Sequence, residues 1–171
     1  MLFRSTGFRI DADSDDVQWA DFPMLGISGD SVIFSANMFA ISSGPFFMHF
    51  GAVPKASLLG GNTAGLQFFE SVSSASTGFA VQPVVSLDGA ASRPLFSSFS
   101  STSLKRTLLT GVPGALTLDF STPSVIAPNG PNPPTADQPG ARQNFATVDN
   151  RFTAAPIQIG ATIWAARAIS A

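Results

Sequence analysis

The sequence contains no cysteine and only one histidine, His49. Without thiols the chain can form neither a disulfide nor a thiolate metal site. A single imidazole is a poor start for any other metal site, and it would be the only histidine base available to a serine nucleophile. We therefore predict no enzymatic activity, no cofactor and no metal, and we expect His49 to be a core or interface residue.

Charged side chains are scarce. The 171 residues include 9 Lys and Arg and 11 Asp and Glu, which together make up 12% of the chain, about half of the usual share. The net charge of −2 provides no basic surface, so we expect no nucleic acid partner. A surface so poor in charge is unusual for a free monomer, and it favours assembly because oligomer interfaces are depleted of Lys, Glu and Asp.

Long apolar helices and a signal peptide are also missing. The longest stretch without a charge, 31–54, contains Asn37 and a Gly44-Pro45 break, which a membrane-spanning helix tolerates poorly. The first 16 residues lack the apolar core of a secretory signal. These features predict a chain that does not contact a membrane.

Tyrosine is absent, whereas phenylalanine occurs 16 times. Phenylalanine carries no polar group and belongs in cores and dry contacts. Apolar residues recur mostly at period two between turns of Gly, Pro and Ser, which indicates strands. A short strand over 8–10 leads through an acidic stretch to a second strand that starts at Val17. The further predicted strands are 31–41, 45–53, 65–72, 78–87, 93–99, 104–109, 114–120 and, as one long C-terminal strand, 156–170.

This pattern predicts a single all-β domain over residues 1–171. The expected architecture is an antiparallel β-sandwich of jelly-roll type, with a closed β-barrel as the alternative. Pro83 lies inside the predicted strand 78–87, which suggests an edge position or a bulge there.

The side chains of the predicted strand 45–53 alternate between two faces that are both apolar. Such a strand is either central in a sandwich or turns one face toward another subunit. Phe46, Met48 and Phe50 share one face, and Phe47 and His49 share the other. The interface candidates are Phe46, Phe47, Met48 and Phe50, together with Trp164 of the C-terminal strand.

Residues 121–140 hold six of the 13 prolines. Because proline has no N–H to donate, we predict a long loop or arm here and neither a strand nor a helix. The segment carries one charge, Asp137, and an apolar pair, Val125 and Ile126, that needs cover. We expect it to lie across its own sheet or that of a neighbouring subunit, which adds this pair to the interface candidates. A plain surface loop is the alternative.

Two short motifs are better explained as turns than as catalytic or nucleotide sites. The sequence Gly29-Asp30-Ser31 superficially resembles serine-hydrolase signatures, but Val32 follows, and His49 is the only imidazole that could serve as the base. The glycine spacing of 60–65 matches a phosphate-binding loop without its lysine.

Residues 11–16 contain four of the 11 acidic side chains. Asp11, Asp13 and Asp15 match the first ligand positions of an EF-hand loop, but Asp16 stands where glycine is needed and Phe22 where glutamate is needed. We predict a solvated turn. Calcium binding between loops and acid–base work by paired carboxylates are the alternatives.

These observations together favour a non-enzymatic structural protein of a virus or phage particle, located in the virion. It would be a capsid decoration (cement) protein or a tail or fibre subunit. Its expected partners are further copies of itself, with a trimer as the expected state, and other structural proteins of the assembly. The alternative is an extracellular lectin-like or receptor-binding module in which Trp19 or Trp164 stacks on a sugar.

Overall fold

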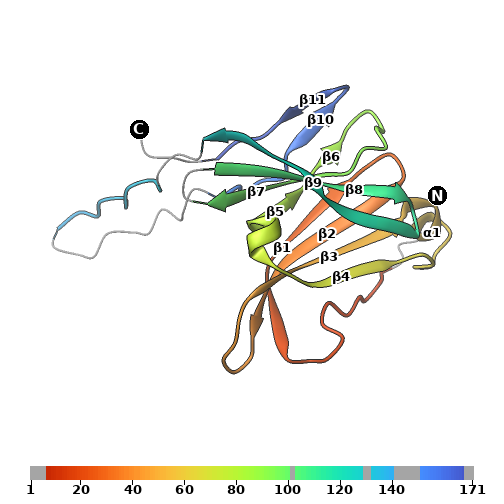
Figure 1. Ribbon diagram of the computed structural model, residues 1–171, viewed down its shortest axis with the longest axis horizontal. Helices are drawn as coiled ribbons and strands as arrows, with labels where there is room; N and C mark the ends of the chain where they lie inside the picture. Colours follow the sequence, from red (N-terminus) through yellow and green to blue (C-terminus); the bar gives the residue numbers. More distant parts are fainter. Residues whose placement is uncertain (1–6, 101–102, 129–131, 141–150, 168–171) are drawn as a thin grey trace.

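In the computed structural model of the chain, the described part comprises residues 7–100, 103–128, 132–140 and 151–167, without the side chains of 99–100 and 121–128. These residues form two β-sheets and two one-turn helices (Figure 1). The strand order is β11-β10-β6-β1-β2-β3-β4 in sheet A and β5-β7-β8-β9 in sheet B.

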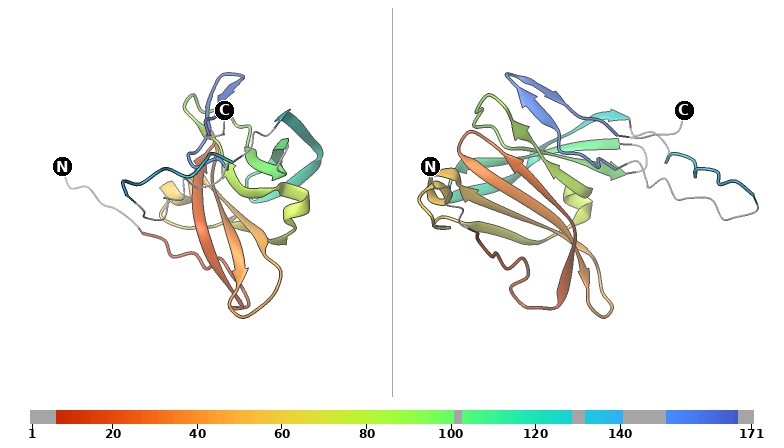
Figure 2. Two further views of the ribbon diagram at one scale, coloured as in Figure 1. Left: turned by 90° about the vertical axis from the view of Figure 1, so that its left-hand side faces the viewer. Right: turned by 180° about the vertical axis from the view of Figure 1, so that it is seen from behind.

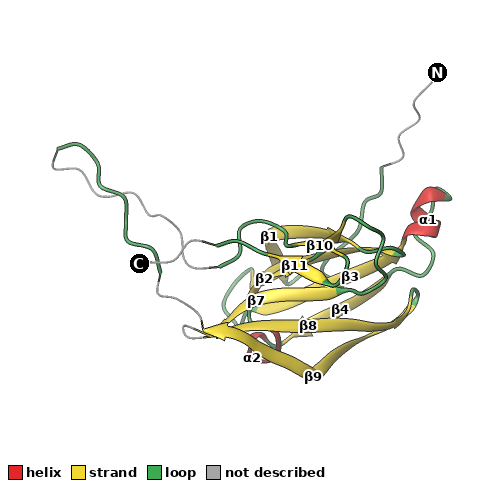
Figure 3. Cartoon of the chain, turned by 90° about the horizontal axis from the view of Figure 1, so that it is seen from above, coloured by secondary structure: helices red, strands yellow, loops and turns green. Residues whose placement is uncertain are grey.

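The elements have the following bounds. Sheet A contains β1 (Gln18–Ile27), β2 (Ser31–Ala40), β3 (Phe47–Pro54), β4 (Gln67–Val72), β6 (Val85–Ser86), β10 (Ile157–Ile159) and β11 (Thr162–Trp164). Sheet B contains β5 (Phe79–Pro83), β7 (Pro94–Ser100), β8 (Ser103–Val112) and β9 (Ala115–Pro128). The helices are α1 (Lys55–Leu59) and α2 (Ser74–Thr77), drawn in red in Figure 3.

The predicted all-β class is confirmed. The two sheets pack around a shared hydrophobic core, an arrangement compatible with a β-sandwich, and among the described residues neither sheet closes into a barrel. A smaller buried cluster contains Val84, Phe96, Leu104 and Phe152. Alternation along the strands builds the shared core, because every second side chain of β2 and β3 faces sheet B. The core cluster consists of Ile33, Met48, Phe50 and Ala52 from sheet A and Val81, Leu95, Leu109 and Leu116 from sheet B.

The hairpin of β2 and β3 was predicted from the sequence and is confirmed, with a register that runs from Ser31 opposite Pro54 to Met38 opposite Phe47. The prediction of one strand over 78–87 was wrong. The chain crosses between the sheets at Val84, so that β5 belongs to sheet B and β6 to sheet A. Sheet A is also not fully antiparallel, because β6 pairs in parallel with both of its neighbours.

Pro83 ends β5, which is an edge strand with a register shift, as its position in the sequence suggested. The long C-terminal strand over 156–170 was wrong. A two-residue turn begins at Gly160 with φ +59° and folds this segment into the hairpin of β10 and β11. Glycine at the first turn position makes this positive φ inexpensive, as in type II′ hairpins.

The prediction that all of 121–140 avoids a sheet was also wrong, because β9 extends to Pro128. This strand lies at the edge of sheet B, where a missing N–H can face away from the ladder. It also bulges strongly: from the pair Leu108–Asp119 to the pair Arg106–Ser124, β8 moves two residues while β9 moves five. The prolines are thus tolerated by an irregular edge strand.

Residues 132–140 do not lie across the sheets of their own chain. Figures 1 and 2 show this segment extending away from the two sheets at one end of the molecule. Most of its residues are exposed to solvent. The expectation that this segment lies across the chain's own sheet is therefore not met in these views, and contact with a neighbouring subunit stays a prediction.

Side chains of β2 satisfy the irregular backbone of β5. In the bulge of β5, Ala80 has a positive φ of 50°, and its N–H is not used in the ladder with β7. The Asn37 Oδ1 atom accepts this N–H at 3.1 Å, and the Ser35 hydroxyl donates to the Val81 carbonyl at 2.5 Å. Two buried polar side chains of sheet A thereby bind the edge strand of sheet B, which matters because unpaired buried backbone groups are costly.

Replacing Asn37 with alanine should destabilise the fold, because it leaves the buried N–H of Ala80 without an acceptor. We expect the free energy of unfolding in urea to fall by about 1–3 kcal/mol. The matched control is Asn62→Ala, since Asn62 accepts only the N–H of Ala64 in an exposed loop. An equal loss in both variants would contradict a role of Asn37 in joining the sheets.

Candidate functional site

The outer face of sheet A, which points away from sheet B, carries two rows of apolar side chains. Paired residues on neighbouring strands point to the same side of a sheet, so the register defines each row. The first row crosses five strands, about 19 Å at the usual strand spacing. It runs through Trp164, Ile157, Val85, Ile27 and Val32.

The second row lies beside the first and runs through Leu25, Phe34, Gly51 and Phe68. The Phe34 ring covers Gly51 so closely that a Cβ atom there would lie 1.8 Å from the ring. Phe34 also meets Phe68 edge to face, with ring centroids 5.5 Å apart. Glycine at position 51 therefore allows Phe34 to lie flat on the sheet.

We refer to the eight side chains of these rows as the outer apolar face. Trp164 is 66% exposed, Leu25 is 55% exposed and Ile157 is 41% exposed, while the other five are half-buried. Not one of the eight is charged or polar. Its members are Leu25, Ile27, Val32, Phe34, Phe68, Val85, Ile157 and Trp164.

A shallow apolar cavity of about 360 Å³ opens beside Trp164. The indole forms one wall, and small side chains leave the space in front of it free. Ile157, the cross-strand partner of Trp164, connects the cavity to the outer apolar face. The lining residues are Ala154, Ala155, Ile157, Trp164, Ala165 and Ala166.

The interface candidates from the sequence are divided between the core and the surface. Met48 and Phe50 are fully buried in the core, because they share a face with residues that point toward sheet B. They stabilise this chain's own fold and offer no surface. Phe47 is half-buried on the opposite side of β3, and Trp164 is exposed.

The remaining candidates lie elsewhere. Phe46 is half-buried at one end of the core. Val125 lies in β9 opposite Lys105, and Ile126 follows it, but the side chains of both lie outside the described residues.

Phe46 belongs to an array of aromatic rings at this end of the sandwich. Trp19 stacks on Phe39 with centroids 5.3 Å apart, and Phe39 stacks on Phe46 at 5.5 Å. Phe46 meets Phe79 of sheet B edge to face at 5.3 Å, and the Arg151 guanidinium lies 4.8 Å from the Phe79 centroid. Trp19 is the outermost ring and is half exposed.

The acidic stretch forms the predicted turn, but residues 8–10 before it are not a strand. Asp13 is buried, where one of its carboxylate oxygens accepts the N–H of Gln18 at 2.7 Å. The carbonyl of Ala12 lies 2.7 Å from the Nδ1 atom of buried His49. This histidine therefore binds the turn to β3, while its Nε2 atom has no partner. The described residues contain no group of three or more His, Cys, Asp or Glu side chains arranged so that they could hold a metal ion.

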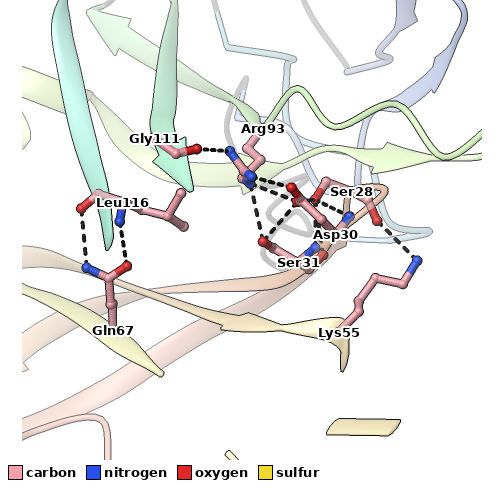
Figure 4. Close-up of polar contacts among 8 residues, drawn as sticks. All are labelled: Ser28, Asp30, Ser31, Lys55, Gln67, Arg93, Gly111 and Leu116. Carbon is pink, nitrogen blue, oxygen red and sulfur yellow. Dashed lines mark hydrogen bonds and ion pairs between the residues drawn. The ribbon is translucent and has the colours of Figure 1, made fainter. Parts of the chain in front are cut away.

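The serine-hydrolase-like motif forms the predicted turn, which joins β1 to β2 and binds Arg93 (Figure 4). Buried Arg93 donates to both carboxylate oxygens of Asp30, at 3.1 and 2.5 Å, and to the carbonyl of Gly111 at 3.2 Å. Ser28 and Ser31 also donate to Asp30. Ser31 faces the core, whereas His49 lies on the opposite side of sheet A, so the structure does not bring these two residues together.

Burial would raise the pKa of Asp30, but hydrogen bonds from Arg93, Ser28 and Ser31 outweigh it and hold the pKa below the usual aspartate value. The carboxylate thus stays ionised opposite the guanidinium. The ion pair joins the first hairpin of sheet A to β7 and β8 of sheet B.

A second contact joins two edge strands, β4 of sheet A and β9 of sheet B. The side-chain amide of Gln67 in β4 donates to the carbonyl of Leu116 at 3.3 Å and accepts its N–H at 2.6 Å (Figure 4). The amide group therefore pairs with β9 in the way that another strand would.

Comparisons with protein-family models, with curated proteins and with solved structures found no match. Of the helices in the described residues, none has the length and apolarity needed to span a membrane. Any functional conclusion therefore depends on the surfaces described above.

Replacing Arg93 with alanine should lower the free energy of unfolding by about 2–3 kcal/mol, because it leaves Asp30 and the Gly111 carbonyl without their donor. We place this value below that of a fully buried pair because Asp30 is 35% exposed. Urea unfolding of Arg93→Ala beside Arg151→Ala, whose arginine lies over aromatic rings, measures this difference. A smaller loss at Arg93 than at Arg151 would contradict the importance of the ion pair.

The lowered pKa of Asp30 also predicts how the ion pair depends on pH. An unfolded aspartate titrates near pH 3.9. Ionised Asp30 therefore stabilises the fold above about pH 4, and this contribution is lost as the pH falls through the lower folded-state pKa. The stability difference between the wild type and Asp30→Asn should be constant above about pH 5 and shrink below about pH 4. A difference that stays unchanged down to about pH 3 would show that Asp30 does not titrate as expected.

Proposed function

We propose that this chain is a non-enzymatic structural subunit that assembles with further copies of itself through the outer apolar face. The observation that carries this proposal is the pair of apolar rows on sheet A, in which Trp164, Leu25 and Ile157 are exposed and no member is charged. Monomeric proteins rarely leave an extended apolar patch open to water.

The apolar character of this face favours a second copy of the chain over a transient partner. Transient interfaces are about as polar as the rest of a protein surface, whereas permanent homo-oligomer interfaces resemble a core cut in half. The chain as a whole agrees with this choice, because only 12% of its residues are charged. Covering the face would remove apolar area from water at a gain of roughly 25 cal/mol per Å².

A virus or phage particle remains the setting that we favour, with the chain as a decoration protein or a tail or fibre subunit. Its support is the combination of the two-sheet fold, the absence of cysteine, the low charge and the segment 132–140 that extends from the body. A jelly-roll topology, a trimer and further structural proteins of the particle as partners belong to the same proposal. Jelly rolls occur in capsid proteins and in lectins, so the fold alone does not choose between these functions.

Replacing Leu25 with aspartate should dissociate the oligomer, because it places a charge in the centre of the face that the neighbouring copy covers. We expect the mass in sedimentation equilibrium to fall to that of one chain at micromolar concentration, with the β-sheet circular dichroism retained.

The matched control is Val112→Asp, because Val112 is also an exposed apolar residue but lies in the β8–β9 hairpin of sheet B. This variant should assemble as the wild type does. A wild-type protein that is monomeric at micromolar concentration, or a Leu25→Asp variant that assembles normally, would contradict the proposed interface.

Glycan binding is a second candidate function, and the exposure of Trp19 favours it. This indole stacks on Phe39 at the end of a rigid aromatic array, and a fixed, half-exposed ring is the kind of platform on which a sugar stacks. Under this candidate, wild-type protein should bind to a glycan array and Trp19→Ala should lose that binding, while Trp164→Ala retains it. An array without signal for the wild type would contradict glycan binding, and the structural function would be the remaining candidate.

A further inference from the structure

The second row of the outer apolar face continues over the C-terminal hairpin as a hollow. The row has no member in β6, because this strand begins only at Val85 and the chain before it belongs to sheet B. β6 and β10 run parallel to β1, with Ile27, Val85 and Ile157 in register (Figure 1). Leu25 precedes Ile27 by two residues, and Ala155 precedes Ile157 by two, so Ala155 lies at the level of the second row.

The same register places Trp164 beside this hollow. Trp164 pairs with Ile157 in the first row, and because β11 runs antiparallel to β10, Ala166 lies on the side of the second row. Ala155 and Ala166 both line the cavity of about 360 Å³, in which four of the six lining residues are alanines. At the hairpin the first row is therefore raised by a side chain that is 66% exposed, and the second row is hollow.

We propose that two copies of the chain pack their outer apolar faces together about a two-fold axis, so that Trp164 of each copy enters the alanine-lined cavity of the other. The axis would lie between the two rows and perpendicular to the strands. This inference rests on the proposed function, because it requires assembly through the outer apolar face, and it adds how the second copy lies on that face.

The two rows are complementary under this symmetry. A two-fold axis between them brings the first row of one copy opposite the second row of the other, strand by strand. Trp164 would then lie over the neighbour's alanines, and Val32 of the first row would lie over the neighbour's Phe34 in the second row. A large side chain meets small ones at both places, which is what close packing requires.

The area of the face also suits a second copy. Sheet A is seven strands wide, about 29 Å at the usual spacing, and the two rows span about four residues, or about 14 Å, along the strands. The rows therefore cover roughly 400 Å² of each copy, about half of the roughly 800 Å² that each partner buries in a stable interface. An apolar centre of this kind inside a more polar rim is the usual anatomy of an interface.

The fluorescence of Trp164 tests whether the indole enters the cavity. The chain has two tryptophans and no tyrosine, so the variant Trp19→Phe leaves Trp164 as the only strong fluorophore. Its emission should shift to shorter wavelength as the concentration rises and copies assemble. The control Trp19→Phe with Leu25→Asp should show no shift. Assembly of Trp19→Phe without a shift would overturn the docking of Trp164.

Filling the cavity should interfere with the neighbour's indole. We expect Ala166→Phe to weaken assembly by about tenfold or more, because overpacking a close contact is costly. Ala166 is exposed, so the melting temperature of the dissociated chain should not change. The control Val112→Phe adds the same ring to an exposed position of sheet B and should assemble normally. Trp164→Ala should weaken assembly as well, because it leaves the neighbour's cavity empty.

Mixing these variants tests the two-fold symmetry. In a mixed pair, the Trp164→Ala chain offers an open cavity to the remaining Trp164, while the filled cavity of the Ala166→Phe chain faces a copy that lacks the indole. An equimolar mixture of Trp164→Ala and Ala166→Phe should therefore assemble more tightly than either variant alone. Absence of this rescue would overturn the reciprocal contact.

The oligomeric state separates this inference from the proposed function. A two-fold contact closes after two copies, whereas a trimer that used this face would need a head-to-tail contact. The trimer was expected from composition, but the raised and hollow ends of the rows favour a pair. If Leu25→Asp dissociates a closed trimer, or if Ala166→Phe and Trp164→Ala assemble normally, the two-fold contact is wrong and the proposed function stands. If the wild type is monomeric at micromolar concentration, both are wrong.

Discussion

The fork between Arg93 and Asp30 is the contact on which the arrangement of the two sheets depends. A buried guanidinium is costly unless its N–H groups are hydrogen-bonded. Here all three of its nitrogen atoms donate, to the Asp30 carboxylate, the Ser31 hydroxyl and the Gly111 carbonyl. The turn between β1 and β2 is thereby bound to the strands of sheet B at the end where Gln67 pairs with Leu116. These contacts hold the two inner faces in one alignment, while the opposite face of sheet A stays outside.

The placement of polar side chains on the inner faces of the sheets follows from the same need to pair buried polar groups. The chain has few charges, and its best hydrogen-bonding side chains face inward to satisfy backbone groups of the opposite sheet, as Asn37 and Ser35 do for β5. Polar groups in these inner positions stabilise a particular alignment of the sheets, because a shift would leave them unpaired and buried. The outer apolar face is built from apolar residues at outward positions of β1, β2, β4, β6, β10 and β11. In a free monomer this pattern is unfavourable, whereas in the proposed assembly it would provide the contact surface.

Local alternation was enough to predict the hairpin of β2 and β3 and the all-β class, because a period of two over ten residues matches the side-chain repeat of a strand and not that of a helix. It could not predict the outer apolar face, whose members come from six strands and meet only through long-range register. In β1 a bulge at Phe22, which has a φ of 53°, breaks the alternation of side chains. Counting residues from the start of the strand therefore does not tell on which face of the sheet Leu25 lies. The prolines of 121–128 led to the wrong prediction that this segment forms no strand, since proline excludes a central strand but not an irregular edge strand.

Because residues from six strands build the outer apolar face, the proposed assembly would be coupled to folding. Trp164 and Ile157 join the face only after the C-terminal hairpin has paired with β6, and β6 reaches β1 only after the chain has crossed from sheet B at Val84. A partly folded chain therefore presents an incomplete surface, and a register slip of one residue in β2 would turn Val32 and Phe34 inward. Because only the folded chain offers both rows, binding of the proposed neighbour would stabilise the fold by mass action. For a protein with few charges this coupling would have a further physical advantage, since the apolar surface that could cause aggregation would form together with the geometry that directs it to the proposed partner.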